Sequence, residues 1–255
     1  MRFDEGFRRP EGVPGLAQAI REQAGGRTLR FMEICGTHTM AIAKAGLRPL
    51  LAPQVRLLSG PGCPVCVTPA GVIDAVLDLA ARPGVTLVSY GDLLRVPGSA
   101  RGDTLLRRRA LGADVRVAYS PLEAVEIAAR EPAREVVFLG VGFETTAHGT
   151  AACVLEAAER GRKNFALVCL LKRTEPALRA LLGAPGFSVD GFLCPGHVAA
   201  VTGAEAFAFL PREYGLPAVV AGFEPADLAA SCALLTKMAL EGTPRLVNTY
   251  TRLVS

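Results

Sequence analysis

The chain has 255 residues, of which half are hydrophobic and a fifth are charged, and its net charge is +4. That length suffices for one large domain or two ordinary ones, each with a full apolar core. The densest basic run, residues 107–109, has no interleaved aromatic side chains, which argues against a nucleic-acid-binding surface. No apolar stretch approaches the roughly 18 residues of a membrane span, and the start of the chain shows no apolar leader. We therefore expect a cytoplasmic protein.

Short apolar runs rich in β-branched residues alternate with longer amphipathic stretches, which is typical of βα units around a mainly parallel sheet. In chain order the pattern predicts helix 14–23, strand 29–34, helix 39–45, strand 55–59, helix 70–82, strand 85–90, strand 115–119, helix 121–130, strand 136–139, helix 145–160, strand 165–170, helix 175–182, strand 191–193, helix 202–210, strand 218–221 and helix 225–240.

These elements predict an α/β fold with two similar lobes, each with a mainly parallel sheet flanked by helices, and a cleft between the lobes. Ser120 followed by Pro121 is a helix-start signal, and a second set of βα units begins there. We therefore expect a first lobe at 1–120, a second lobe at 121–241 and a C-terminal tail at 242–255. Glycine-rich turns follow several predicted strands, where open α/β sheets bind ligands.

Seven cysteines, an odd number without an export signal, make a structural disulfide framework improbable. Cys153, Cys169 and Cys232 fall inside apolar helix or strand patterns and are interpreted as small core side chains. The remaining cysteines lie beside glycine, proline or histidine, so they are the candidates for chemistry.

Cys63 and Cys66 stand three residues apart in the segment SGPGCPVC, on a turn stiffened by glycine and proline. Such a turn can hold a dithiol that closes to a disulfide, and a helix that follows it would favour a thiolate. The alternative is half of a structural zinc site, which needs a second ligand pair of comparable spacing. The chain contains no second CxxC, so we favour redox or metal chemistry.

Cys35 ends a predicted strand and is followed by Gly-Thr-His38, so a thiol and an imidazole can project from one loop. This pair could bind iron, or it could be a nucleophile with its base. His197 in the segment CPGH and Glu144 in the segment GFETT follow strands of the second half in the same way. Glu144 is equally well explained as a helix cap.

Together, the segments FMEICGTHT, LLSGPGCPVCVTPAGVID, SYGDLLRVPGS, FLGVGFETTA, DGFLCPGHV and VVAGFEPAD closely resemble the HypD family of hydrogenase maturation factors, and the resemblance covers nearly the whole chain. The resemblance implies an assembly scaffold rather than a conventional enzyme. On it, iron receives two cyanide ligands and one carbon monoxide ligand, with a HypC-like small chaperone and a HypE-like cyanide donor as partners.

By this resemblance Cys35 and His38 are the metal ligands, and Cys63 and Cys66 form the redox-active pair of the CPVC motif. His197 and Glu144 match the PGHV and GFETT motifs of the family and are expected to contribute to cofactor binding.

Two departures from the family pattern stand out. Relatives continue into a cysteine-rich domain that binds a four-iron, four-sulfur cluster, and the other cysteines of this chain lack the spacing of such ligands. We therefore expect no cluster ligands in this chain. Met40 stands where many relatives have a second histidine, and Cys194 stands where an aliphatic residue is more usual. For Met40 we favour packing over metal binding.

Two other functions remain open. A metal-free thiol-disulfide oxidoreductase would use Cys63 as nucleophile and Cys66 as resolving thiol, and Cys35 would have no role. A module that binds a partner without redox competence would tolerate loss of both thiols.

Overall fold

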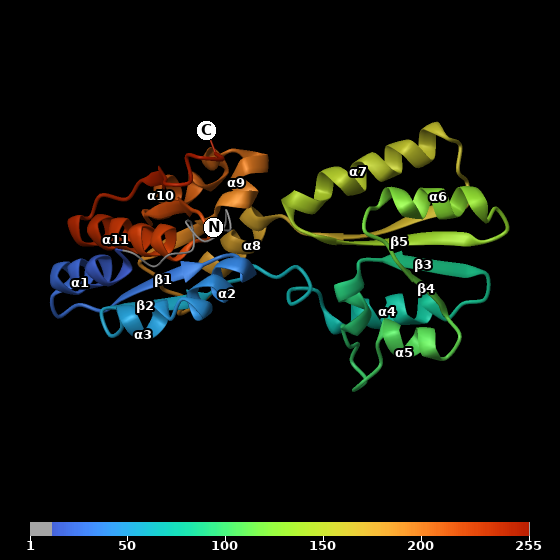
Figure 1. The fold of residues 1–255 in the computed structure, drawn as a ribbon, viewed down its shortest axis with the longest axis horizontal. Helices are drawn as coiled ribbons and strands as arrows, with labels where there is room; N and C mark the ends of the chain where they lie inside the picture. Colours follow the sequence, from blue (N-terminus) through green and yellow to red (C-terminus); the bar gives the residue numbers. More distant parts are fainter. Residues whose placement is uncertain (1–11, 255) are drawn as a thin grey trace, which may run out of the picture. The chain divides into compact units, whose positions relative to one another are not determined.

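The chain folds into parallel sheets covered by helices in the computed structural model, which describes residues 12–254 (Figure 1). These residues form two compact units. The first unit contains the chain up to Gly62 and again from Thr174 onward, and the second is the continuous segment Cys63–Arg173. The α/β fold predicted from the sequence is confirmed.

The first unit is built on a parallel sheet with the strand order β2-β1-β7-β8-β9. Its elements are α1 (Val13–Ala24), β1 (Leu29–Glu33), α2 (Gly36–Lys44), α3 (Leu47–Leu51), β2 (Val55–Ser59), α8 (Thr174–Leu182), β7 (Gly191–Pro195), α9 (Gly196–Thr202), the 3₁₀ turn η2 (Ala204–Phe207), α10 (Phe209–Tyr214), β8 (Ala218–Ala221), α11 (Pro225–Glu241) and β9 (Leu246–Asn248).

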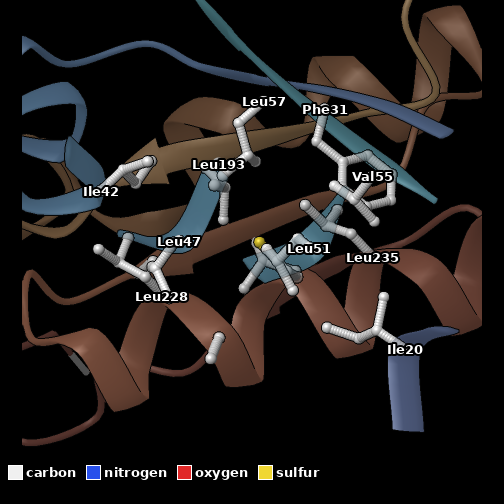
Figure 2. Packing of buried hydrophobic residues seen from close by; sticks show 14 of the residues in the cluster. Ile20, Phe31, Ile42, Leu47, Leu51, Val55, Leu57, Leu193, Leu228 and Leu235 are labelled. Carbon is white, nitrogen blue, oxygen red and sulfur yellow. The ribbon is translucent and has the colours of Figure 1, made fainter. Parts of the chain in front are cut away.

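One face of this sheet is covered by α1, α2, α3 and α11, whose apolar sides meet the strands in a single cluster (Figure 2). Phe31 of β1 and Leu235 of α11 are fully buried there. Full burial of a side chain of this size stabilises the fold by about 1.5–3 kcal/mol. Helix α11 starts with Pro225 in its first turn and ends at Gly242, whose φ of 63° is left-handed. The opposite face of the sheet packs against α8, α9 and α10.

The second unit is built on a parallel sheet with the strand order β4-β3-β5-β6. Helices α6 and α7 cover one face and α4 and α5 the other (Figure 1). The elements are α4 (Ala70–Ala80), β3 (Val85–Ser89), the 3₁₀ turn η1 (Gly91–Arg95), α5 (Leu105–Ala110), β4 (Asp114–Val117), α6 (Leu122–Arg130), β5 (Glu135–Gly142), α7 (Glu144–Glu159) and β6 (Phe165–Leu171).

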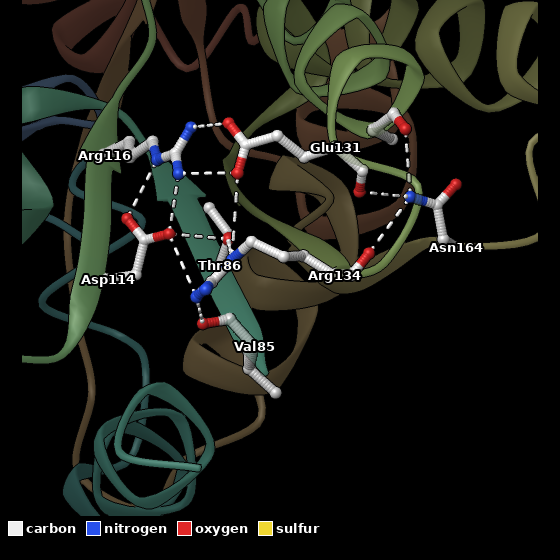
Figure 3. Close-up of polar contacts among 8 residues, drawn as sticks. Val85, Thr86, Asp114, Arg116, Glu131, Arg134 and Asn164 are labelled. Atoms are coloured by element: carbon white, nitrogen blue, oxygen red, sulfur yellow. Dashed lines mark hydrogen bonds and ion pairs between the residues drawn. The ribbon is translucent and has the colours of Figure 1, made fainter. Parts of the chain in front are cut away.

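A polar network joins the starts of β3 and β4 to the α6–β5 loop (Figure 3). Arg116 donates to both carboxylate oxygens of Glu131 at 2.5 and 2.9 Å and to Asp114 at 2.8 and 2.7 Å. The hydrogen bond from Arg116 is the largest cause of the lowered pKa of Asp114. Asn164 closes the network by donating to the Ala128, Glu131 and Arg134 carbonyls.

The division of the chain differs from the predicted lobes at 1–120 and 121–241. Strand β1 pairs with β7 in parallel, with Phe31 opposite Gly191, and β7 continues the sheet to β8. Strands from both ends of the sequence therefore share one sheet, and residues 63–173 are inserted between β2 and α8. The segment 242–255, predicted as a tail, contributes β9, which pairs with β8. Hydrophobic periodicity predicts strands but carries no information about their partners.

Smaller differences concern individual helices. The predicted helix 202–210 corresponds to η2 and the start of α10, and α9 before it was not predicted; Gly203, with a φ of 81°, separates α9 from η2. The helices α3 and α5 were not predicted. They have only five and six residues, which is too short for a clear 3.6-residue period.

Candidate functional site

Cys35 lies at the carboxyl edge of the first unit's sheet, where β1 passes into α2. It is the residue directly before the first turn of α2, in an extended conformation, and its thiol is free and buried. Backbone N–H groups and the positive end of the helix dipole at such a position favour a negatively charged sulfur. The structure therefore places this thiol at the N-terminal end of α2.

The glycine-rich segment after β2 packs directly on the Cys35 turn. A Cβ atom built on Gly62 would lie 2.5 Å from the Cα atom and 2.6 Å from the backbone nitrogen of Cys35. Only glycine fits at this approach. Because Gly62 is followed in the chain by Cys63, the covalent chain tethers the CPVC segment to the Cys35 turn.

His38 lies in the first turn of α2 and is fully buried. Its Nε2 atom is 2.9 Å from the Gly222 carbonyl oxygen, so Nε2 carries the hydrogen and donates it. Burial lowers the pKa of His38 to about 4 and keeps the ring neutral. Its Nδ1 atom therefore retains a lone pair, and that atom is buried without a hydrogen-bond partner. A neutral imidazole with a free lone pair is the form that binds a metal ion.

His197 lies in the first turn of α9, after β7, and meets the same aromatic ring as His38. The ring centroid of Phe223 is 4.6 Å from that of His38 and 5.4 Å from that of His197. Burial lowers the pKa of His197, and its Nδ1 atom is also buried without a partner. The turn after β8 thus brings two neutral histidines from two other strand ends to one side chain.

Glu33 is a buried carboxyl group at the end of β1, two residues before Cys35. Its Oε1 atom accepts hydrogen bonds from Arg48 at 2.6 Å and Ser59 at 2.9 Å, and a longer one from Thr39 at 3.4 Å. Burial is the main cause of its raised pKa, and these contacts oppose the rise. Hydrogen bonds to this carboxyl group therefore join β1 to β2, α2 and α3 close to the Cys35 turn.

A groove of about 630 Å³ lies beside this turn on the first unit. Its walls come from α2 and from the turn between β8 and α11, and its lining residues are Thr37, Met40, Ala41, Lys44, Ala45, Phe223, Glu224 and Pro225. Met40 is 58% exposed, so the packing role favoured for it is wrong. It faces the groove because α2 presents it on the side opposite Ile42, which is buried.

Cys63 and Cys66 lie at the start of the second unit, in a turn closed by a hydrogen bond from the Val67 amide to the Cys63 carbonyl. Both thiols are free, and their Sγ atoms are 2.8 Å apart. The backbone N–H of Cys66 donates to the sulfur of Cys63 at 3.3 Å. The thiol hydrogen bond to Cys63 is the main cause of the raised pKa of Cys66. The sulfur of Cys63 therefore accepts hydrogen bonds from both the backbone and the side chain of Cys66.

The turn itself, and not a following helix, creates this arrangement. Helix α4 begins only at Ala70, four residues after Cys66. The sequence predicts that the start of that helix stabilises a thiolate, whereas the direct donor to the Cys63 sulfur in the structure is the backbone amide of Cys66.

Glu144 is the first residue of α7 and belongs to the second unit. As an acidic side chain in the first turn, it interacts favourably with the helix dipole. The predicted site residues are thus distributed as two groups: Cys35, His38 and His197 in the first unit, and Cys63, Cys66 and Glu144 in the second.

The remaining cysteines differ in their surroundings. Cys153, Cys194 and Cys232 are buried, and burial raises their pKa values, to about 11 for Cys153 and about 12 for Cys232. Cys169 is exposed, so its interpretation as a core residue is wrong, because β6 lies at an edge of its sheet.

Sequence reasoning missed Phe223 and Glu33 as members of the site. The position of Phe223 could have been recognised from the sequence, since it lies in a Gly-Phe-Glu segment after a predicted strand. Glu33 had none, because a charged residue in a predicted strand is ordinarily placed on its exposed face.

Residues 12–254 lack two further kinds of functional feature. No group of three or more His, Cys, Asp or Glu side chains there could hold a metal ion. None of the helices in that range is long and apolar enough to cross a lipid bilayer.

Comparisons with known proteins agree along the whole chain. The model of the hydrogenase formation hypA family, HypD, matches residues 12–255. A hydrogenase maturation factor HypD from Azotobacter vinelandii is 45% identical over 261 residues, covering all of this chain and 69% of that protein. Those from Escherichia coli K12 and Rhodobacter capsulatus are 43% and 42% identical, and this chain covers 69% and 68% of their lengths.

Proposed function

Since the chain belongs to the HypD family of hydrogenase maturation factors, we propose that it is the scaffold on which the iron of a NiFe hydrogenase receives its cyanide and carbonyl ligands. The iron is the cargo of this scaffold and leaves it for the hydrogenase. A role in hydrogenase maturation is common to the family, and the residues that hold the iron are assigned from this chain.

The observation that carries the proposal is the free lone pair on the Nδ1 atom of His38. The Gly222 carbonyl holds the opposite ring nitrogen in its protonated form, so the tautomer and the ring orientation are set before iron arrives. Cys35, three residues earlier, offers a thiol at the start of the same helix. Thiolate and neutral imidazole are both suitable ligands for iron.

Two protein ligands suffice for this cargo. Iron with two cyanides and one carbon monoxide already carries three ligands, and a HypC-like partner contributes a further thiol. We assign the groove beside α2, with exposed Met40 in its wall, as the place where the partner's thiol enters.

We assign Cys63 and Cys66 as the local electron source. Oxidation of the two thiols to a disulfide releases two electrons and two protons, and an external dithiol or iron–sulfur reductant must restore them. The short distance between the Sγ atoms supports this step, as does the amide donor to Cys63. The tether through Gly62 links the pair to the Cys35 turn. We propose that this assembly takes place in the cytoplasm, where reducing conditions keep such thiols reduced.

The test uses the complex with a HypC-like partner and infrared spectroscopy. Wild type should show bands in the cyanide and carbonyl stretching regions. His38→Gln should lose them, because a glutamine amide can still donate to Gly222 but offers no Nδ1 lone pair. His148→Ala, at an exposed position on α7, is the matched control and should keep them. Bands that persist at wild-type intensity in His38→Gln would contradict the assigned iron ligand.

The geometry of the thiol pair also supports the metal-free oxidoreductase, and Cys35→Ala separates the two functions. On the scaffold hypothesis this variant loses the infrared bands. If Cys35→Ala keeps full thiol-disulfide exchange activity and wild type shows no bands, the oxidoreductase is the better description.

A further inference from the structure

Strand β6 forms an edge of the second unit's sheet and is unusually apolar for that position. Its residues read Phe-Ala-Leu-Val-Cys-Leu-Leu, with no charge, proline or glycine. Within residues 12–254 it pairs on one side only, with β5. None of its seven residues is fully buried, and Ala166 and Cys169 are exposed. A long apolar edge of this kind is a template for another strand.

The other sheet edges among the described residues are protected in the usual ways. Strand β2 carries Arg56, and β4 carries Asp114 and Arg116. Strand β9 is only three residues long. Charges and short length discourage the addition of a further strand. Strand β6 has neither charged residues nor a short length, so its apolar edge needs another explanation.

Alternate residues of β6 point their backbone groups toward the free edge. The carbonyl group of Asn164 accepts a hydrogen bond from the amide of Val136, and the amide of Lys172 donates one to the carbonyl group of Gly142. Both are even-numbered, so the backbone groups of the even-numbered residues of β6 point toward β5. Because the direction alternates along a strand, the N–H and C=O groups of the odd-numbered residues face outward. These are Phe165, Leu167, Cys169 and Leu171.

Basic residues stand at both ends of this edge. Arg162 and Lys163 precede β6, and Lys172 and Arg173 follow it. A second copy of the chain is a poor occupant, because antiparallel pairing centred on Val168 would place Lys163 opposite Arg173. Like charges directly opposite one another destabilise a strand pair. An occupant with acidic ends would instead meet Arg162 and Lys163 at one end and Lys172 at the other.

We propose that the free edge of β6 binds an extended apolar peptide segment with acidic residues at both ends, which adds to the sheet as a further strand. Backbone hydrogen bonds to the outward groups supply affinity, and the basic flanks select the partner. Strand β6 contains none of the residues assigned to the iron or to the thiol pair, so its test does not depend on the proposed function.

The test measures fluorescence anisotropy with a labelled peptide, Glu-Glu-Val-Thr-Val-Thr-Val-Glu-Glu, and the full chain. A second peptide with lysines in place of the glutamates is the charge control. Cys169→Pro removes one outward N–H and should leave the β5 pairing intact, because proline is tolerated on an edge strand where its nitrogen faces solvent. Cys169→Ala keeps the N–H and is the matched control. Arg162→Glu with Lys163→Glu tests the flank without altering the strand.

The acidic peptide should bind, and the basic one should bind at least about tenfold more weakly. Cys169→Pro should lower the affinity for the acidic peptide by about tenfold, whereas Cys169→Ala should leave that affinity unchanged. The double charge reversal should reduce the preference for the acidic peptide. Equal binding of both peptides, or unchanged binding in both Cys169→Pro and the charge reversal, would overturn the proposal. A dimer in light scattering that Cys169→Pro abolishes would also overturn it, because the edge would then belong to a second copy.

Discussion

Replacing Gly62 by alanine adds a single methyl group at the contact between the glycine-rich turn and the Cys35 turn. The new Cβ atom would lie 2.5 Å from the Cα, 2.6 Å from the nitrogen and 2.8 Å from the carbonyl carbon of Cys35. Favourable carbon–carbon contacts lie at about 3.5–4.0 Å, so the two backbones must separate by about 1 Å. No change of rotamer can relieve this contact, because all three atoms belong to the main chain.

Overpacking of this kind costs about 1–3 kcal/mol in the free energy of unfolding. For a chain of this length that corresponds to a melting temperature lower by about 2–12 °C. The damage should be local, since Gly62 packs within the first unit. Faster hydrogen exchange is therefore expected in β1 and the start of α2, with β5 and α6 of the second unit unchanged.

The matched control is Gly15→Ala, which adds the same methyl group within α1. Nothing lies within 4 Å of the Cβ position there. Alanine in a helix is about 0.5–1 kcal/mol more favourable than glycine, so this variant should be more stable than wild type. Thermal unfolding followed by far-ultraviolet circular dichroism suits a protein without tryptophan. If Gly62→Ala melts at or above the wild-type temperature, the close approach of the two turns is refuted.

Three further predictions concern other parts of the molecule. Mild oxidation should remove two alkylatable thiols from wild type but none from Cys63→Ala, as counted by mass spectrometry; the same loss in both would assign the disulfide to other cysteines. The pKa of Asp114 is lowered in the fold by Arg116, so its stabilisation is present above the ordinary carboxyl pKa and is lost as the pH falls through the folded value. Asp114→Asn should therefore unfold more easily in urea at pH 7, and its difference from wild type should shrink toward pH 3; a constant difference would contradict the ion-pair explanation. Leu235→Ala should lower the free energy of unfolding by about 2–5 kcal/mol, whereas a loss below 1 kcal/mol would show that its site is not closely packed.

The sequence predicted the strands well because their signal is local. Strands 29–34, 55–59 and 218–221 coincide with β1, β2 and β8 to within a residue. Apolar runs rich in β-branched residues and bounded by glycine or proline identify such strands without knowledge of their neighbours. The signal for the thiol pair was equally local, since Cys63 and Cys66 stand only three residues apart in the chain and their sulfur atoms are in contact.

The pairing of strands could not be predicted in the same way. Nothing in the letters of β1 indicates that it pairs with β2 on one side and, on the other, with β7, which lies some 160 residues later. The misplaced boundary at residue 120 follows directly from this. The exposure of Cys169 follows as well, because a strand becomes an edge strand only through the order of the sheet.

For the candidate site, the amino-acid sequence by itself determined the α/β class, the CGTH and CPVC motifs and the family to which they belong. Only the tertiary structure decided that His38 and His197 share Phe223, that the Gly222 carbonyl selects the tautomer of His38, and that Gly62 packs on Cys35. The physical reason is the same in each case. Residue types and short spacings are properties of the local chain, whereas hydrogen bonds and close contacts between strand ends depend on which strands the sheet places side by side.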